Sequence, residues 1–324
     1  MLDVLLASIL TGAVRSGVSV LYATLGEIIS ERAGVVNLGV EGCMLMGACA
    51  GFVVEAITGN ALLAIAAAAV AGGSLALIHA FLSITRGANQ LASGLATMFF
   101  GLGLTGLLGA PYVKANITGL NTVSIPLLGD LPFVGPILFR HDLLTYLAML
   151  LAPALWLMLT RTRWGLAIRA VGERPTVAFA AGLSPARVQY SAVIVGGMLA
   201  GLGGAQLSLA YTHTWVEGMT AGRGFIAVAL VIFSMWDPLK ALVGAGLFGG
   251  AVAFQFQLQS LGVPISPFIL DMFPYVLTLL VLLVWGQTGK RAMPEGLKSV
   301  LAGGSQNPIA AGPVALRSAT SAAE

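Results

Sequence analysis

Long, continuous apolar stretches constrain this chain more than any other feature of its sequence. In hydrocarbon every backbone polar group must be hydrogen-bonded within the spanning structure, so a membrane-crossing chain forms helices or a closed barrel. Barrel strands alternate apolar and polar residues, whereas these stretches are uniformly apolar, which favours helices. We predict an all-α polytopic transmembrane helix bundle with about nine spans, or roughly eight to ten because boundaries shift by a few residues. The expected spans are Val4–Ile29, Leu38–Ile57, Ala61–Ile84, Leu91–Ala110, Leu143–Thr160, Val188–Leu209, Phe225–Trp236, Leu239–Gln259 and Ile269–Gly286.

The scarcity of charge excludes an ordinary soluble domain. Only 9% of the residues are charged and 57% are hydrophobic, whereas a soluble domain carries about 25% charged residues. The solvent that suits such a surface is membrane lipid. The net charge of +3 gives no reason to expect a nucleic-acid partner.

Two of the stretches depart from a simple span. Phe225–Trp236 is short for the roughly 20 residues that a bilayer needs, so it is expected to be re-entrant or broken. The first stretch is long and carries Arg15 near its middle, which predicts an interfacial turn between a short surface helix and a shorter span. No basic region or cleavage site precedes Arg15, so we expect this stretch to be retained.

Basic residues predict the orientation of the spans. With nine alternating spans, twelve basic residues fall on one side and three on the other. Cytoplasmic loops carry an excess of Lys and Arg, so we expect the N-terminus outside and the C-terminus in the cytoplasm. The twelve are Arg32, Arg86, Arg161, Arg163, Arg169, Arg174, Arg187, Lys240, Lys290, Arg291, Lys298 and Arg317, and the three are Lys114, Arg140 and Arg223.

These spans define a membrane domain over residues 1–290 with two extramembrane segments. Residues 111–141 contain four prolines and are expected to form an ordered external loop without long helices. Residues 161–187 form a cytoplasmic loop that carries five arginines and one acid. Residues 291–324 form a cytoplasmic tail that is rich in small residues and is expected to be disordered.

The cytoplasmic loop has the sequence signals of a short helix of about two turns. Pro175 suits a first helical turn, and Gly182 can supply the left-handed residue after the last turn. Ser184 and Pro185 are typical of the N-cap and first residue of a following helix. Phe179 is an apolar side chain that a partner could bury. The residues alone leave two interpretations open: a helix packed on its own bundle, or a helix that contacts a partner.

Glycines recur four residues apart on three of the apolar stretches. Small residues at this spacing let two helix backbones approach closely in a membrane. We expect each pair to face another helix. The pairs are Gly47 and Gly51, Gly197 and Gly201, and Gly246 and Gly250.

Three motifs together resemble one family. They are SERAGVVNLGVEG at residues 30–42, RGANQLASG at 86–94, and WGLAIRAVGE at 164–173 followed by Ala181-Gly182. The chain resembles permeases of ATP-driven ABC importers that work with BMP-type substrate-binding lipoproteins and import nucleosides or simple sugars. That branch is related to ribose and branched-chain amino acid permeases. The resemblance covers roughly residues 15–286.

The resemblance implies a multi-pass protein of the bacterial inner membrane that works with several partners. They are a cytoplasmic ABC ATPase, a second permease subunit that is identical or homologous, and a periplasmic or lipoprotein substrate-binding protein. It also implies that the short cytoplasmic helix couples the permease to the ATPase. The coupling residues on this reading are Glu173, Arg174, Thr176, Ala181 and Gly182.

The chain itself is not expected to be an enzyme. Its sequence has no G-x-x-x-x-G-K-[ST] phosphate-binding loop, so ATP would be hydrolysed by the partner, and no cofactor is expected here. It also lacks a His-Glu-x-x-His metal motif. We expect no catalytic, cofactor or metal site.

An uncharged nucleoside or sugar favours amides, hydroxyls and aromatic faces along its path rather than full charges. Gln255 and Gln259 are four residues apart and share a helix face. Every candidate for the translocation path has the alternative of an inter-helix hydrogen bond. The candidates are Asn37, Asn89, Gln90, Ser93, Thr97, Gln206, His213, Gln255 and Gln259.

Charged residues in or near the spans need compensation, because an uncompensated charge at mid-bilayer costs about 2.5–3.5 kcal/mol on insertion scales. Glu41 is expected to pair with Arg32 or to cap backbone N–H groups. The residues expected at the interfaces are Glu55, Arg223 and Asp271, and those expected in a local cluster at the cytoplasmic face are Glu27, Glu31 and Arg32.

Three alternatives remain open. The substrate of the importer is alternatively a ribose-like monosaccharide or a branched-chain amino acid. An ion-coupled secondary transporter would need a carboxylate relay at the membrane centre, whereas the acids here cluster near the interfaces. An intramembrane hydrolase is only nominally supported, by Ser93-Gly94 with His79, His141 and His213.

Overall fold

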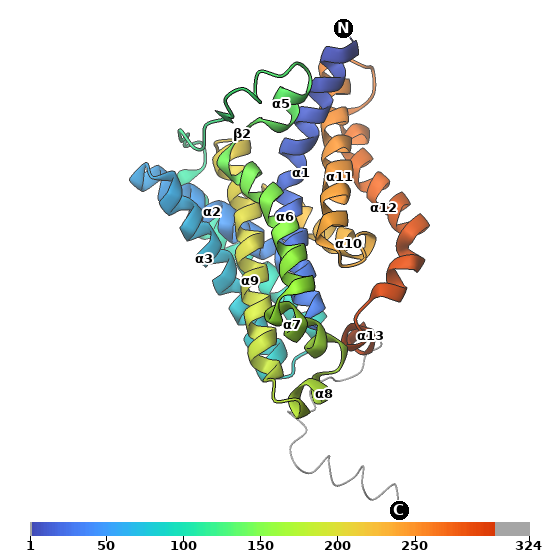
Figure 1. The fold of residues 1–324 in the computed structure, drawn as a ribbon. Coiled ribbons are helices and arrows are strands. Elements are labelled where there is room, and N and C mark those ends of the chain that lie inside the picture. Colours follow the sequence, from blue (N-terminus) through green and yellow to red (C-terminus); the bar gives the residue numbers. More distant parts are fainter. Residues whose placement is uncertain (1, 302–324) are drawn as a thin grey trace, which may run out of the picture.

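The computed structural model describes residues 2–301 and is almost entirely helical (Figure 1). Its only sheet in that range is a pair of two-residue antiparallel strands, in which Val123 pairs with His141. The predicted all-α polytopic architecture is therefore confirmed. The elements are α1 (Leu2–Arg32), α2 (Val40–Thr58), α3 (Ala61–Ala80), η1 (Phe81–Thr85), α4 (Gln90–Gly109), η2 (Ala110–Tyr112), β1 (Val123–Ser124), α5 (Val134–Leu138), β2 (Arg140–His141), α6 (Leu143–Arg161), α7 (Arg163–Glu173), α8 (Pro175–Ala180), α9 (Pro185–Ala205), η3 (Gln206–Tyr211), α10 (Arg223–Phe233), α11 (Pro238–Ser260), α12 (Pro267–Ala292) and α13 (Glu295–Leu301).

Seven helical stretches within residues 2–301 are long and apolar enough to cross a membrane. They coincide with seven of the nine predicted spans. The remaining two predicted spans correspond to shorter apolar helices, α10 and the Pro267–Val281 part of α12. The bundle is thus polytopic, whereas the count of nine and the orientation of the termini stay predictions. Most of the tail predicted to be disordered, residues 302–324, lies outside the described residues.

The first helix corrects one expectation. We predicted an interfacial turn near Arg15, but α1 is a single helix of 31 residues that runs through Arg15 without a break. A helix of this length is roughly 46 Å long, which exceeds the roughly 30 Å hydrocarbon core of a bilayer. No proline interrupts it, so the extra length is taken up by continuing the helix and not by a turn.

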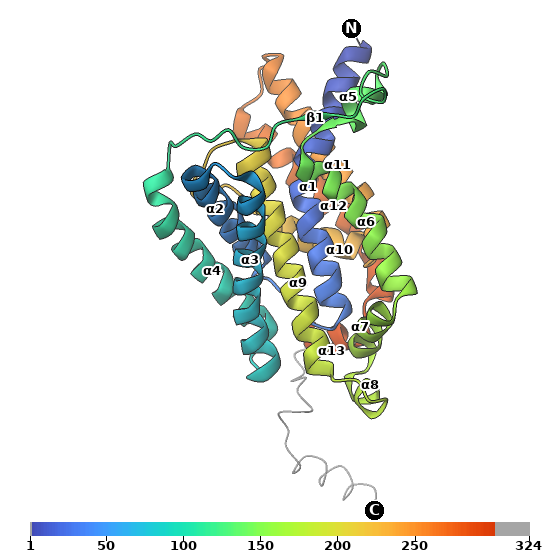
Figure 2. The same ribbon diagram turned by 60° about the vertical axis from the view of Figure 1, so that its left-hand side comes forward.

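Two helices form the centre of the bundle. The span that contains α9 is the most deeply buried of the seven and packs against α1, α2 and α3. On its other side α1 packs against α11 and α10. Figure 2 shows α1 and α9 in the middle, with α4 at one edge and α6 at the other. The short α7, α8 and α13 lie together at one end of the bundle, called here the α8 end, and the N-terminus lies at the other end (Figure 1).

Glycines set the close approach of the central helices. A Cβ added to Gly47 would collide with the backbone of Gly201 on α9, and one added to Gly201 would collide with Ala68 on α3. The pairs that begin at Gly47 and Gly197 therefore face other helices, as predicted. The expectation for the third pair is wrong for Gly246, where an added Cβ meets no atom within 4 Å, while one at Gly250 would make only ordinary contact with Ala13 on α1, at 3.8 Å. The face of α11 that touches α1 carries Gly249 instead, which abuts the backbone of Ala13 and Gly17.

This difference predicts opposite outcomes for two conservative substitutions. Gly47→Ala forces α2 away from α9 and is expected to destabilise the protein by about 1–3 kcal/mol, the usual cost of overpacking. Gly246→Ala meets open space and is expected to change the stability by no more than about 0.5 kcal/mol. The midpoints of thermal unfolding in detergent measure both effects. Equal midpoints for the two variants would contradict the packing described.

The segment predicted to be an external loop is ordered and contains no helix longer than α5. The two strands are supported by Tyr146, whose hydroxyl donates to the Val123 carbonyl at 3.0 Å. Arg140 forms an ion pair with Asp130 at 3.2 Å. The His141 side chain is buried, and its Nε2 lies 2.7 Å from the Ile137 carbonyl while its Nδ1 has no hydrogen-bond partner in the described structure. Burial lowers the pKa of His141, an effect that the Ile137 hydrogen bond opposes.

A lowered pKa predicts that this segment loosens in acid. The unfolded segment takes up a proton on His141 near its ordinary pKa of about 6.5, whereas the folded segment takes it up only at a lower pH. The stability that neutral His141 contributes is therefore present above that value and falls as the pH drops below it. Tryptic cleavage after Lys114 should accelerate between about pH 7 and pH 5.5. The control His141→Gln keeps a donor for Ile137 and should remove most of this pH dependence.

Candidate functional site

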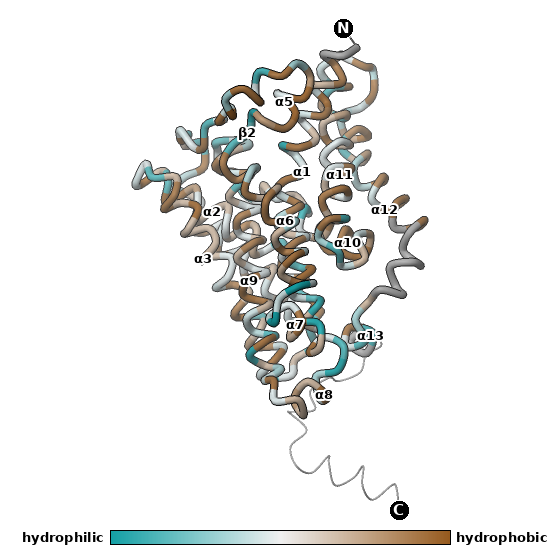
Figure 3. Tube along the Cα trace, viewed as in Figure 1, coloured by the Kyte–Doolittle hydropathy of each residue, from teal (hydrophilic) through white to brown (hydrophobic). Residues whose placement is uncertain are grey.

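Hydrophilic segments lie at both ends of the bundle, and one group of them surrounds α7 and α13 at the α8 end (Figure 3). Here α6 ends and Thr162 caps the following helix, because its hydroxyl accepts a hydrogen bond from the Gly165 N–H at 3.1 Å. The next helix, α7, packs against the end of α1. Gly172 makes this contact possible, since a Cβ there would collide with the carbonyl of Arg32. The predicted coupling loop is thus in direct contact with the backbone of α1 at Gly172.

The predicted short helix exists as α8. Pro175 occupies its first turn, and Gly182 adopts the left-handed conformation (φ 86°) after it, as expected. Ser184 is the N-cap residue of α9 and Pro185 begins the helix, as predicted, although the Ser184 side chain makes no capping hydrogen bond. Pro185 suits the first helical position because its missing N–H would have no partner within the helix.

Both interpretations of α8 find support in its side chains. Ala178 is buried against the bundle, whereas Phe179 is 68% exposed and Val177 is 58% exposed. One side of α8 therefore packs against the bundle, and its other side exposes two large apolar side chains. Such exposed apolar residues are typical of an interaction surface.

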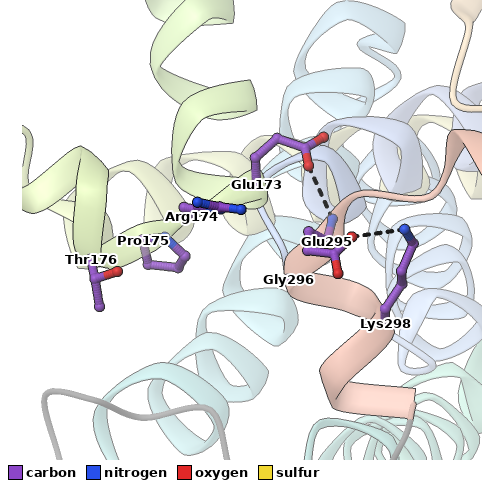
Figure 4. Close-up of a pocket in the computed structure, with 7 residues that line it drawn as sticks. All are labelled: Glu173, Arg174, Pro175, Thr176, Glu295, Gly296 and Lys298. Carbon is purple, nitrogen blue, oxygen red and sulfur yellow. Dashed lines mark hydrogen bonds and ion pairs between the residues drawn. The ribbon is translucent and has the colours of Figure 1, made fainter. Parts of the chain in front are cut away.

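A cleft of about 440 Å³ separates α8 from α13 (Figure 4). Glu173, at the end of α7, accepts a hydrogen bond from the backbone N–H of Glu295 at 3.2 Å, which attaches α13 to α7. Glu295 also forms an ion pair with Lys298 at 2.7 Å. The hydrogen bond and the charge of Lys298 lower the pKa of Glu295. The buried Leu297 anchors the same helix in the core.

Three of the five predicted coupling residues line this cleft. Glu173, Arg174 and Thr176 lie along one wall, and Figure 4 shows Arg174 between the α8 residues and α13. Ala181 and Gly182 follow α8 and are exposed, outside the lining of the cleft. Their role in coupling stays a prediction. Nothing in the sequence predicted that α13 would form the opposite wall.

Four of the predicted translocation-path residues make structural hydrogen bonds, and three of them do so around the irregular connection between α1 and α2. The Gln90 side chain accepts from the Val36 N–H at 2.9 Å and donates to the Gly34 carbonyl at 3.4 Å. Asn37 accepts from the Gly39 N–H at 2.9 Å. Asn89 caps α4 by accepting from the Ala92 N–H at 3.0 Å. These contacts match the bent-backbone and inter-helix alternatives, and contact with a solute stays a prediction.

The fourth, Ser93, lies 3.1 Å from Nδ1 of His79. The other ring nitrogen of His79 is 3.0 Å from the Val36 carbonyl. Because Nε2 must then carry the proton, Nδ1 accepts the Ser93 hydroxyl. The structure thus pairs two members of the nominal hydrolase set. Both are buried at 6% and 0% exposure, and the imidazole is engaged on both sides, so the pair holds the connection in place.

Three of the buried acids, Glu27, Glu31 and Glu41, each have a distinct partner. Glu27 accepts from the Asn37 N–H at 2.7 Å, and Glu31 accepts from the Trp236 indole at 2.6 Å. Arg32 donates to the Trp236 carbonyl at 3.2 Å and 3.3 Å. The predicted cluster of Glu27, Glu31 and Arg32 is therefore local, but its members bind neighbouring segments and not one another. Trp236, which holds two of them, was missed.

Glu41 caps backbone N–H groups, which was one of the two predictions for it. The other prediction, an ion pair with Arg32, is wrong. Its carboxylate accepts from the Thr220 hydroxyl at 2.6 Å, the Gly222 N–H at 2.8 Å and the Gly224 N–H at 2.6 Å. These donors lie at the start of α10, so α2 holds the N-terminus of a short helix far away in the sequence. The site follows the rule that carboxylates favour helix N-termini.

Residues 8–284 match the family described as the permease component of the branched-chain amino acid transport system. The chain belongs to this permease family. A protein of Haloferax volcanii, provisionally named as a glucose ABC transporter permease, is 47% identical to the permease described here, over 81% of this chain and 80% of its own.

Two further relatives carry nucleoside names. The guanosine ABC transporter permease protein NupQ of Bacillus subtilis is 36% identical, over 81% of this chain and 86% of its own. The nucleoside ABC transporter permease protein NupC of Lactococcus lactis is 32% identical, over 85% and 90%. No solved structure matches the permease.

Proposed function

We propose that this permease is the membrane subunit of an ATP-driven importer of nucleosides or simple sugars in the bacterial inner membrane. The observation that carries the proposal is the similarity, over about four-fifths of each chain, to permeases named for glucose, guanosine and nucleosides. The exposed apolar residues of α8 support a cytoplasmic ATPase as the partner at that end. A second permease subunit and a substrate-binding protein complete the proposed importer.

The position of Glu41 supports an uncharged substrate. In transporters with broken helices, the N-terminus of a half-helix can bind an anionic group of the substrate. In this permease the equivalent N–H groups of α10 already bind the Glu41 carboxylate. An amino acid carboxylate would compete with a fixed negative charge there. We therefore favour nucleosides or sugars over branched-chain amino acids.

Transport by the complete complex tests this proposal. The permease is reconstituted with its second permease, ATPase and substrate-binding protein, and uptake of labelled guanosine, glucose and leucine is compared with and without ATP. We expect ATP-dependent uptake of guanosine or glucose and none of leucine. Uptake that follows an ion gradient without ATP, or uptake of leucine alone, would refute the proposal.

A further inference from the structure

The start of α10 holds an arginine whose side chain is only partly satisfied. One terminal nitrogen of Arg223 donates to the Met219 carbonyl at a long 3.4 Å, and its buried Nε has no hydrogen-bond partner among the described residues. Tyr211, Tyr275 and Glu41 are electrostatic neighbours of its guanidinium group. A guanidinium offers five N–H donors, so most of this capacity is available to another group.

Arg223 lies at the start of α10, which packs against α1, α2 and α12 inside the bundle. The first turn of α10 is held by Glu41 on α2, and the Trp236 indole beyond its last turn is held by Glu31 on α1. Ionisable residues within a membrane bundle usually face its interior or a solute pathway. The interfacial position expected for Arg223 from the sequence stays a prediction.

Polar side chains continue from Arg223 toward the opposite end. Tyr275 on α12 donates to the Ala221 carbonyl at 2.8 Å and remains 40% exposed. Asp271, one turn earlier on the same face of α12, accepts a hydrogen bond from Gln255 on α11. Since α12 packs on both α10 and α11, these four side chains come from three adjoining helices. We name Arg223, Tyr275, Asp271 and Gln255 the polar track.

We propose that the polar track binds the hydroxyl groups of the transported solute, an uncharged polyhydroxylated molecule such as a nucleoside or a sugar. This inference rests on the proposed function and adds a binding site to it. Arg223 supplies donors, Asp271 supplies acceptors and Tyr275 supplies an aromatic face with a hydroxyl. The set is charge-balanced and matches neutral hydroxyls, which need both donors and acceptors. Of the path residues predicted from sequence, only Gln255 belongs to it.

Thiol labelling tests the site without ATP. Both native cysteines are buried, so a single Tyr275→Cys substitution gives a specific target for a membrane-impermeant thiol reagent. We expect millimolar guanosine or glucose to slow its labelling at least threefold, and leucine to have no effect. The control Leu127→Cys, at a residue that is 87% exposed in the segment predicted to be external, should label equally fast with and without solute. Absence of protection at Tyr275→Cys, or equal protection of the control, would overturn the site.

Transport kinetics give a second readout in the complete complex. Arg223→Gln should raise the KM for uptake at least tenfold, and Tyr275→Phe should raise it about threefold to tenfold, while ATP hydrolysis stimulated by the loaded binding protein stays within twofold. Tyr190→Phe, which removes a hydroxyl bonded to Thr85 at the α8 end, should leave KM unchanged. Unchanged KM in both track variants would refute the inference.

The two proposals fail separately. A wild-type complex without ATP-driven uptake refutes the proposed function even if solutes protect Tyr275→Cys, and the track is then a solute site in another kind of transporter. A complex that imports guanosine or glucose normally, with no protection and unchanged KM in both variants, keeps the function and removes the track. Variant levels in the membrane are measured throughout, and Tyr275→Phe serves where Arg223→Gln does not accumulate.

Discussion

Replacing both Glu173 and Arg174 by alanine is expected to abolish ATP-dependent uptake by the reconstituted complex. Glu173 accepts the hydrogen bond that attaches α13 to α7, and Arg174 lines the cleft between α8 and α13. The double substitution removes the contact that positions α13 and a charged residue at the surface where we expect the ATPase to bind. Uptake should fall at least twentyfold while the permease still accumulates in the membrane.

A charge-matched control separates this effect from a general loss of polarity. Glu295→Ala together with Lys298→Ala also removes one acid and one base from the same cleft. It removes only an exposed ion pair, which water and salt screen and which therefore contributes little, and it keeps the Glu295 backbone N–H for Glu173. We expect at least half of the uptake to remain. Glu173→Gln, which preserves an acceptor, should be intermediate. Full uptake in the Glu173→Ala, Arg174→Ala variant would remove the coupling assignment.

Replacing Glu41 by glutamine is expected to destabilise the permease by about 3 kcal/mol or more, because hydrogen bonds to a charged group contribute about 1.5–3 kcal/mol each. The carboxylate accepts three hydrogen bonds at the start of α10. Glutamine offers one acceptor oxygen and turns an amide donor toward backbone donors. The unfolding midpoint in detergent and the steady-state level in the membrane should both fall.

The same helix provides the control for this experiment. Glu55 is also a buried glutamate on α2, at 4% exposure against 7% for Glu41. Its Oε2 has no hydrogen-bond partner in the described structure. Glu55→Gln removes a poorly satisfied buried charge, so it is expected to leave stability unchanged or to increase it. A loss equal to that of Glu41→Gln would mean that α2 needs negative charge in general, not a cap on α10.

Features that depend on one residue and its neighbours in the sequence were predicted correctly. The start of α8 at Pro175 and its end at Gly182 were predicted because each depends on the backbone chemistry of one residue. Most span positions followed from apolar length in the same way. The glycine pair on α11 failed because this helix carries several glycines, and spacing alone does not reveal that Gly249 is the one that faces α1.

Contacts between distant segments could not be predicted. Glu41 and its donors are separated by 179 to 183 residues, so the sequence predicted backbone capping without the helix that is capped. The contact between α13 and Glu173 was also missed, because the sequence around Glu295 does not indicate that it packs against α7.

The two ends of α10 are held by carboxylates from different helices. Glu41 on α2 binds its first turn, and Glu31 on α1 binds the Trp236 indole just beyond its last turn. If α1 slides lengthwise past α2, the contacts of α10 with Glu41 and with Glu31 move in opposite directions, and α10 must tilt. A shift of about 2 Å over a helix of roughly 16 Å corresponds to a rotation of about 7°. Gly172 on α7 is in direct contact with the end of α1. A displacement of α7 would therefore be transmitted through α1 to the Trp236 end of α10.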